Sequence, residues 1–195
     1  MRKVLWILWV ITWVAPLRAD ERDDARIDLI AEKDQIEMVV QKTSEGATAR
    51  HADWRKEMAP YYVVVLFPAA AEWKTASITF LPKGTGKVVL NLTGPNVKGK
   101  NKVPETIWIA YDDVKAEGTT IENGSFELLL PSGQPKGWYV PPYQTDLFGS
   151  VKKSGAADGL NYIVVWHNYR YAQSLNVTEG KPVTLTFRYR LEPES

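Results

Sequence analysis

Residues suited to catalysis are few in this sequence, and their spacing matches no common catalytic motif. The chain has two histidines, His51 and His167, and it contains no Gly-x-Ser-x-Gly or His-Glu-x-x-His motif. Acidic residues that could form a glycosidase pair occur at Asp112, Asp113 and Glu127, but nothing in the sequence places two of them across a cleft. We therefore predict a protein that is not an enzyme.

Aromatic residues that could bind a sugar concentrate in two segments, residues 137–143 and 162–173. Trp and Tyr rings offer flat surfaces for the apolar faces of sugars, and neighbouring polar groups can bond sugar hydroxyls. The second segment surrounds a short connection between two predicted strands, where rings come close to solvent. The candidate carbohydrate-binding residues are Trp138, Tyr139, Trp166, His167, Asn168, Tyr169, Arg170 and Tyr171. A core position is the alternative for each ring, above all for Trp138.

The acidic residues Asp112, Asp113 and Glu127 could also hold a metal ion. Ca²⁺ prefers clustered carboxylate and carbonyl oxygens. If the strand with Asp112 and Asp113 lies beside a strand at residues 123–127, three carboxylates approach one another, and a cation would neutralise them. The alternative is that an aspartate caps a turn while Glu127 pairs with a lysine or arginine. The spacing forms no known calcium motif, so both hypotheses stay open.

The elements that must position these residues are β-strands. Residues 182–191 alternate strictly, with Val183, Leu185, Phe187 and Tyr189 on one face and Thr and Arg residues on the other. The other alternating segments are residues 36–42, 61–67, 73–80, 87–93, 106–114, 162–167 and 171–177. Gly and Pro residues separate these segments, and the pattern predicts an all-β protein, an antiparallel sandwich or barrel.

Two segments do not follow the strand pattern. Residues 20–33 are highly charged, and we expect a lead-in without regular structure or a short helix. Residues 49–58 are expected to form one or two helical turns or a long loop between strands.

The N-terminal residues 1–19 have the features of a signal peptide. Arg2 and Lys3 precede an apolar run, and residues 17–19 form a plausible cleavage site. The run is shorter than the roughly 20 residues that span a bilayer, although a retained membrane anchor is the alternative. We predict export to the periplasm, the cell surface or the medium, with residues 20–195 as one mature domain without a membrane span.

Charge and cysteine content narrow the class of protein further. The 24 basic residues less Arg2, Lys3 and Arg18 leave 21 against 23 acidic ones, which gives no electrostatic case for nucleic acid. The chain has no cysteine, so an exported form has neither disulfides nor a thiol nucleophile. Both features fit a bacterial exported protein.

A family resemblance rests on short motifs in both halves of the chain. IENGSFE at residues 121–127, followed by Gly137-Trp138, resembles the opening of a jelly-roll carbohydrate-binding module of the galactose-binding-domain-like type. Residues 171–190 resemble a strand pair that follows in that family, and residues 72–118 resemble its closing strands. The resemblance implies a jelly-roll sandwich, with Glu127 and an aspartate of residues 112–113 as ligands of a structural calcium.

In this chain the two halves, 20–118 and 119–195, stand in swapped order. A circular permutant of one jelly roll explains the order, because the first and last strands of such sandwiches are neighbours that a short linker can join. Two incomplete modules in tandem are the alternative, but each would expose strand edges around a small core.

The predicted function is non-catalytic binding of a poly- or oligosaccharide through exposed aromatic residues. The alternative is a structural or adhesive protein of the cell surface that uses the sandwich to contact another protein.

Overall fold

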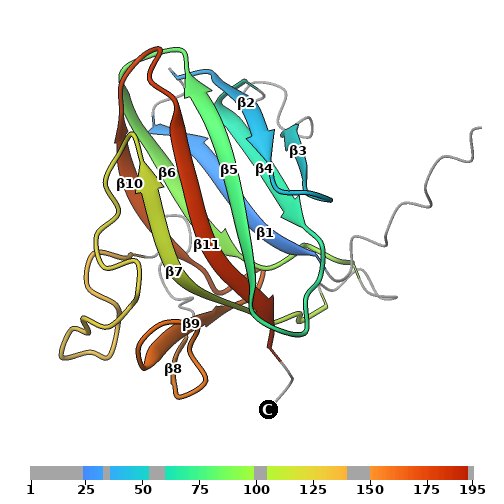
Figure 1. Ribbon diagram of the computed structural model, residues 1–195, viewed down its shortest axis with the longest axis vertical. Helices are drawn as coiled ribbons and strands as arrows, with labels where there is room; N and C mark the ends of the chain where they lie inside the picture. The colour runs from blue at the N-terminus through green and yellow to red at the C-terminus, as the bar shows by residue number, and fades with distance from the viewer. Residues whose placement is uncertain (1–23, 33–35, 53–59, 99–104, 140–149, 193–195) are drawn as a thin grey trace, which may run out of the picture.

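Two antiparallel β-sheets packed face to face form the protein, as the computed structural model shows (Figure 1). The structure describes residues 24–32, 36–52, 60–98, 105–139 and 150–192. The predicted β-sandwich is therefore confirmed. The predicted signal peptide lies outside the described residues.

The five-stranded sheet has the strand order β10-β6-β1-β4-β3, and the six-stranded sheet has the order β2-β5-β11-β7-β9-β8. The strands of the five-stranded sheet are β10 (Tyr171–Val177), β6 (Gly86–Thr93), β1 (Ala25–Ala31), β4 (Tyr62–Phe67) and β3 (Thr48–His51). Those of the six-stranded sheet are β2 (Met38–Thr43), β5 (Lys74–Pro82), β11 (Val183–Leu191), β7 (Ile109–Glu117), β9 (Asn161–Val165) and β8 (Ser150–Lys153). Both sheets contain strands from both halves of the chain, and β11 lies between β5 and β7.

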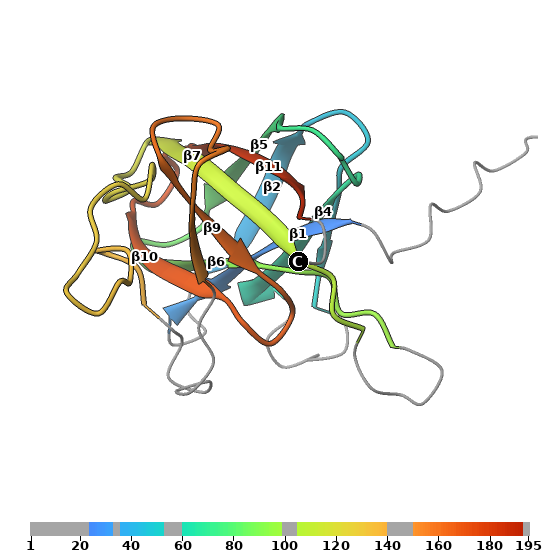
Figure 2. The same cartoon turned by 90° about the horizontal axis from the view of Figure 1, so that it is seen from below.

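The core lies between the sheets, which Figure 2 shows from below. Alternation places Val183, Leu185, Phe187 and Tyr189 of β11 inside, as predicted. The rings of Phe187 and Phe67, which come from opposite sheets, pack edge to face with their centroids 5.1 Å apart. Contacts of this kind fix the position of one sheet on the other through complementary side-chain shapes as well as through burial of apolar surface.

The expectation for residues 20–33 was wrong at its centre, because residues 25–31 form β1 in the middle of the five-stranded sheet. Ala25, Ile27 and Leu29 of this strand face the core. Arg26 and Asp28 alternate with them, and this charge is what made the segment resemble a solvated lead-in. The two side chains form an ion pair with 2.7 Å between Nε and Oδ1. Because each charge neutralises the other, both side chains can be buried on the outer face of the sheet.

Two further expectations differ from the structure. Thr48–His51 is an edge strand, β3, rather than part of a helix, and residues 53–59 lie outside the described residues. Residues 123–127 form a turn instead of a strand, because Asn123 and Phe126 have φ angles of 52° and 59°. Extended backbone has negative φ, and two left-handed residues within five positions interrupt it.

The segment of residues 119–139 covers the edge of the five-stranded sheet beside β10. Tyr139 and Ala172 exchange backbone hydrogen bonds of 2.9 and 2.7 Å. Thr119 donates its hydroxyl to the carbonyl of Asn176 at 2.7 Å, and the side-chain oxygen of Gln173 accepts the N–H of Glu122 at 2.7 Å. The edge of β10 is thus paired partly by side chains, which blocks pairing with another strand there.

Candidate functional site

The turn between β9 and β10 carries the strongest group of predicted binding residues. Trp166 and Tyr169 exchange backbone hydrogen bonds of 2.9 and 3.1 Å, so His167 and Asn168 occupy a two-residue turn. β9 belongs to the six-stranded sheet and β10 to the five-stranded sheet, so the turn crosses from one sheet to the other at the end of the sandwich.

A stack of three aromatic rings lies on one side of this turn. The rings of Trp166 and Tyr169 stack at 25° with centroids 5.5 Å apart. Trp108 contacts both, with centroid distances of 6.1 Å to Trp166 and 6.0 Å to Tyr169. All three side chains are partly exposed. We call Trp108, Trp166 and Tyr169 the aromatic stack.

Trp108 was absent from the predicted site residues, although the sequence contained a signal for it. Inward-facing Ile109 and Tyr111 fix the alternation of the β7 segment, which places Trp108 on the outer face with Ala110. The partner of Trp108 could not be read from the sequence. That partner depends on the antiparallel register, which pairs Ile109 with Val165. The residue before Ile109, Trp108, is thereby brought beside the residue after Val165, Trp166.

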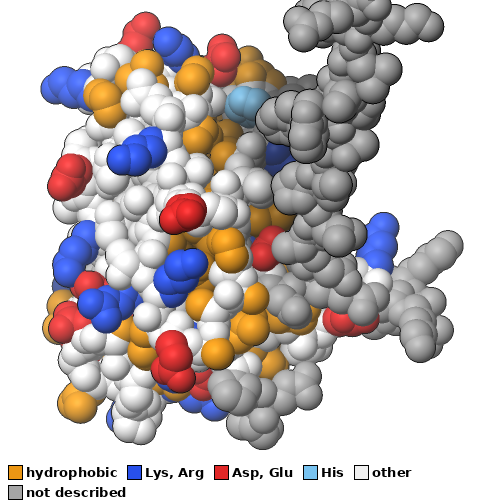
Figure 3. All heavy atoms as spheres, turned by 45° about the vertical axis from the view of Figure 1, so that its right-hand side comes forward, with side chains coloured by type: hydrophobic (Ala, Val, Ile, Leu, Met, Phe, Trp, Pro, Cys, Tyr) orange, Lys and Arg blue, Asp and Glu red, His pale blue; other side chains and the backbone are white. Residues whose placement is uncertain are grey.

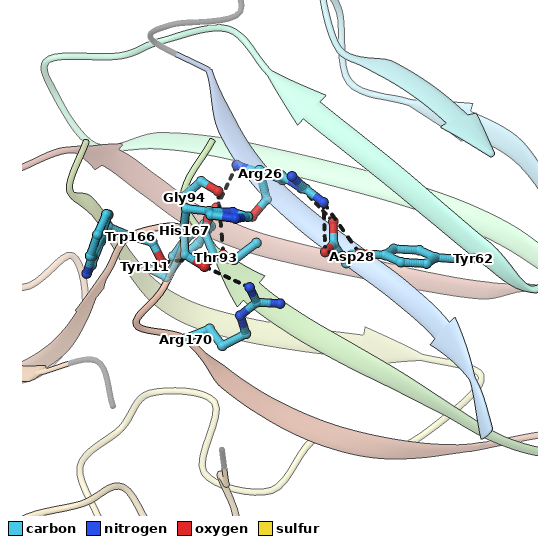
Figure 4. A network of polar contacts seen from close by, with 9 residues as sticks. All are labelled: Arg26, Asp28, Tyr62, Thr93, Gly94, Tyr111, Trp166, His167 and Arg170. Atoms are coloured by element: carbon cyan, nitrogen blue, oxygen red, sulfur yellow. Dashed lines mark hydrogen bonds and ion pairs between the residues drawn. The ribbon is translucent and has the colours of Figure 1, made fainter. Parts of the chain in front are cut away.

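A polar network holds the other side of the turn (Figure 4). Thr93 places its hydroxyl 3.4 Å from the carbonyl of Trp166, and Arg170 donates to the carbonyl of His167 at 2.7 Å. Gly94 lets the chains approach, because a Cβ there would lie 2.8 Å from the Trp166 Cα atom. In Figure 4 the ring of His167 points toward Arg26, while Trp166 points away from it.

The network continues into β1 and across the core. Asp28 accepts hydrogen bonds from Arg26 Nε at 2.7 Å and from the Tyr62 hydroxyl at 2.7 Å. Burial by itself lowers the pKa of Arg26, but the charge and hydrogen bonds of Asp28 and Tyr62 together outweigh it, so the pKa is raised above its ordinary value. From the opposite sheet, the Tyr111 hydroxyl accepts the N–H of Arg26 at 3.0 Å and lies 3.0 Å from the carbonyl of Thr93. These bonds tie the turn to both sheets.

His167 is held neutral in this setting. Burial lowers its pKa from 6.5 to about 4, and the nearby positive charges of Arg170 and Arg26 act in the same direction, opposed in part by Asp28. The imidazole can therefore serve as a neutral hydrogen-bonding group at pH 7.

We expect stability to fall as the pH drops through the range between the unfolded and folded pKa values of His167, from 6.5 to about 4. In that range the unfolded chain binds a proton at His167 and the folded chain does not, so the free energy of unfolding decreases. Because the ring is partly exposed and solvent screens its charge, we expect a loss of roughly 1–2 kcal/mol. Urea unfolding between pH 7 and pH 4 measures this loss. His167→Gln should flatten the curve by that amount, and an unchanged pH dependence in the variant would show that His167 is not the cause.

The structure separates the other predicted sugar-binding residues. Trp138 is 4% exposed and packs on Phe126 with ring centroids 5.1 Å apart, so it occupies the core position that was its alternative. Tyr171 is buried too, and burial raises its pKa to about 12. Tyr139 is exposed but lies beside β10, where its hydroxyl is 2.9 Å from Ser174.

The predicted calcium ligands do not come together in one site. Asp112 accepts the N–H groups of Ala157 and Asp158 at 2.7 and 2.9 Å. Asp113 forms an ion pair with Lys115 at 2.8 Å. The described part of the chain has no group of three or more His, Cys, Asp or Glu side chains placed to hold a metal ion.

Glu127 is likewise committed to the backbone. One of its oxygens accepts the N–H groups of Leu160 and Asn161 at 2.7 and 2.8 Å, and the other accepts from the Asn161 side chain at 3.0 Å. Burial raises the pKa of Asp112, while backbone N–H groups favour its charged form. The carboxylates of Asp112 and Glu127 accept hydrogen bonds from the backbone of residues 157–161 and so hold this segment in place. Because these oxygens already have partners, the residues do not fit the predicted calcium site. Calcium binding itself remains an untested prediction.

A second aromatic group lies on the outer face of the six-stranded sheet. The rings of Trp73 and Tyr162 meet edge to face at 5.5 Å, and the Arg190 guanidinium lies 4.7 Å from the Trp73 ring. Arg190 also forms an ion pair with Glu192 at 3.2 Å, and Trp73 donates to the carbonyl of Gly155 at 2.8 Å. Because these groups are bonded to one another, we assign this cluster a structural role.

Comparison with protein families, with curated proteins and with solved structures gave no match for this chain. The described residues contain no helix of the length and apolar character needed to cross a membrane. On the face seen in Figure 3, basic and acidic side chains are interspersed, without a large patch of one sign. The resemblance to a carbohydrate-binding module therefore stays a hypothesis.

Proposed function

We propose that the protein is a non-catalytic carbohydrate-binding β-sandwich, and that the aromatic stack of Trp108, Trp166 and Tyr169 contacts the sugar. The observation that carries this proposal is the contact among three partly exposed rings at one end of the sandwich. Such rings offer an apolar surface with little side-chain entropy to lose, which suits the C–H faces of sugar rings.

The position of the stack supports a binding role. Trp108 lies directly before β7, where its carbonyl accepts the N–H of Glu192 at 2.9 Å, and Trp166 and Tyr169 form the two ends of a tight turn. Backbone hydrogen bonds therefore fix all three residues before any ligand arrives. A preorganised surface loses less conformational entropy on binding than a flexible loop does. Asn168 is partly exposed in the same turn and can offer both an amide donor and an acceptor to sugar hydroxyls.

The arrangement of the histidines supports binding without catalysis. His51 lies in β3, at the edge of the five-stranded sheet opposite to β10, whereas His167 lies in the turn that precedes β10. The acidic residues Asp112 and Glu127 hold backbone N–H groups and so act as structural acceptors. Export by the predicted signal peptide would bring such a protein to extracellular glycans.

Retention on insoluble polysaccharides and a glycan array test the proposal directly. We expect Trp166→Ala and Tyr169→Ala each to weaken binding at least about tenfold, because each removes a stacking surface worth more than about 1.4 kcal/mol. Both variants should stay folded, since the rings are partly exposed. Tyr139→Ala is the matched control, because it removes an exposed ring outside the stack.

Two results would overturn the proposal. One is failure of the folded wild-type protein to retain any glycan. The other is equal binding by the wild type and by a variant in which Trp166 and Tyr169 are both replaced with Ala.

Protein contact is the second candidate function, and a group of exposed leucines favours it. Leu128, Leu130 and Leu160 are 57%, 42% and 68% exposed. Glu127 accepts the N–H of Leu160 at 2.7 Å and so brings the loop of Leu160 beside that of Leu128. Exposed apolar groups of this kind mark contact surfaces. If Leu128→Ser and Leu160→Ser leave glycan binding unchanged, the leucines take no part in glycan binding, and the two functions use separate surfaces.

A further inference from the structure

Glu192 follows directly after β11 and lies beside the aromatic stack. The strands β11 and β7 are neighbours in the six-stranded sheet (Figure 1), and their register sets Leu191 opposite Ile109. The next pair along the two chains is Glu192 and Trp108, whose backbones are joined by the N–H of Glu192. Residues directly opposite each other in an antiparallel pair point to the same face, so Glu192 shares the outer face of the sheet with Trp108.

Two donors hold the carboxylate of Glu192 in place. One oxygen accepts from the Tyr162 hydroxyl at 3.0 Å, and the other accepts from Arg190 Nη2 at 3.2 Å. Burial raises the pKa of the Tyr162 hydroxyl, and its hydrogen bond to Glu192 acts in the same direction, so the hydroxyl keeps its proton at pH 7. Tyr162 and Arg190 are themselves fixed by their contacts with Trp73. The structural role of this second aromatic group therefore includes fixing the position of one carboxylate.

The carboxylate of Glu192 retains hydrogen-bonding capacity. An ionised carboxylate has about four positions for donors, and the described residues fill two of them on Glu192. The side chain is 14% exposed, so a ligand at the surface can reach it. A carboxylate only accepts hydrogen bonds, and one that is positioned beforehand suits a ligand that donates them.

The ion pair of Arg190 and Glu192 has a direction relative to the stack. Glu192 lies opposite Trp108, whereas Arg190 lies opposite Ala110. The guanidinium of Arg190 lies 4.7 Å from the Trp73 ring, which belongs to the other aromatic group. The negative member of the pair is therefore the one next to the stack, and a sugar that lies on Trp108 meets a carboxylate first.

We propose that Glu192 determines the specificity of the aromatic stack for neutral sugars, by accepting hydrogen bonds from two adjacent hydroxyl groups of a sugar ring that lies on Trp108. Stacking by itself discriminates little among sugars, because it needs only an apolar face. Charge-assisted hydrogen bonds depend on the position of the donor and so select among ligands. An acidic sugar is disfavoured there, because two carboxylates at close range repel each other. The inference rests on the proposed function and adds the class of sugar that the site accepts.

Glu192→Gln tests this role, because Gln keeps the size of the side chain and removes its charge. The probes are insoluble cellulose, mannan and galactan, each used as such and after oxidation of its primary hydroxyls to carboxylates. We expect the wild type to retain at least one neutral polymer, and to bind its oxidised form at least about tenfold more weakly. Glu192→Gln should bind the neutral polymer at least about tenfold more weakly than the wild type does, because charge-assisted hydrogen bonds are lost.

The oxidised polymers separate ligand contact from a structural role. Loss of the Glu192 charge frees the guanidinium of Arg190, so Glu192→Gln should bind the oxidised polymer roughly threefold more tightly than the wild type does. A variant that had only lost stability would bind both forms more weakly. Glu117→Gln is the matched control, since Glu117 is an exposed carboxylate at the other end of β7. Urea unfolding shows whether the variants are folded under the binding conditions, and the comparison of the two polymer forms in the wild type needs no variant.

The inference fails on any of four results. They are equal retention of neutral and oxidised polymer by the wild type, binding by Glu192→Gln that equals the wild type for both forms, weaker binding of both forms by Glu192→Gln, and no retention of any of these polymers by the wild type. If one of the first three results occurs while Trp166→Ala loses binding, the proposed function stands without this inference. If the folded wild type retains no glycan at all, both fail.

Discussion

Replacing Asp28 with Ala should lower the free energy of unfolding by about 3–5 kcal/mol, because the change breaks a buried ion pair by removing the carboxylate that accepts hydrogen bonds from Arg26 and Tyr62. Asp28 is 0% exposed and accepts two hydrogen bonds from Arg26, at 2.7 and 3.0 Å, and one from Tyr62 at 2.7 Å. For a chain of this size, that loss corresponds to a fall in melting temperature of roughly 6–20 °C.

Urea unfolding of Asp28→Ala at pH 7 measures this effect. The informative control is a variant in which all three residues become apolar, with Arg26→Met, Asp28→Leu and Tyr62→Phe together. That variant should be more stable than Asp28→Ala, because it removes the buried positive charge of Arg26 together with the carboxylate that binds it. If the unfolding free energy of Asp28→Ala lies within about 1 kcal/mol of the wild-type value, the ion pair is not buried as described.

Replacing Trp138 with Ala should cost about 3–5 kcal/mol of unfolding free energy, the range for removing a large buried aromatic side chain. Trp138 packs on Phe126 and donates its indole N–H to the carbonyl of Asn123 at 3.1 Å. Both contacts hold the segment of residues 119–139 against the core. The change therefore removes core volume and a hydrogen bond at once.

Tyr139→Ala is the neighbouring comparison, because Tyr139 is exposed and its loss should change the unfolding free energy far less. Chemical unfolding gives the stability of both variants, and glycan retention below the unfolding transition gives their binding. We expect folded Trp138→Ala to bind glycan as the wild type does. Loss of binding with unchanged stability would instead make Trp138 a ligand contact.

Local alternation was enough to predict most of the fold. Strands such as β11 and β5 bury every second residue, and a period of two is a property of consecutive residues that needs no partner to be recognised. β1 was missed because Arg26 and Asp28 look solvated when each is read alone. Their burial depends on mutual neutralisation and on Tyr62, which is contributed by β4.

For the candidate site, too, the sequence predicted some residues and the tertiary structure decided the others. Residue type alone singled out Trp166 and Tyr169, because few other side chains offer a flat face for a sugar. Only the tertiary structure brought Trp108 to them, buried Trp138, and turned Glu127 from a predicted metal ligand into an acceptor for the 160–161 backbone. Types and periods are local properties of the chain, whereas burial and hydrogen-bond partners arise from strand register and from loops that meet only after folding.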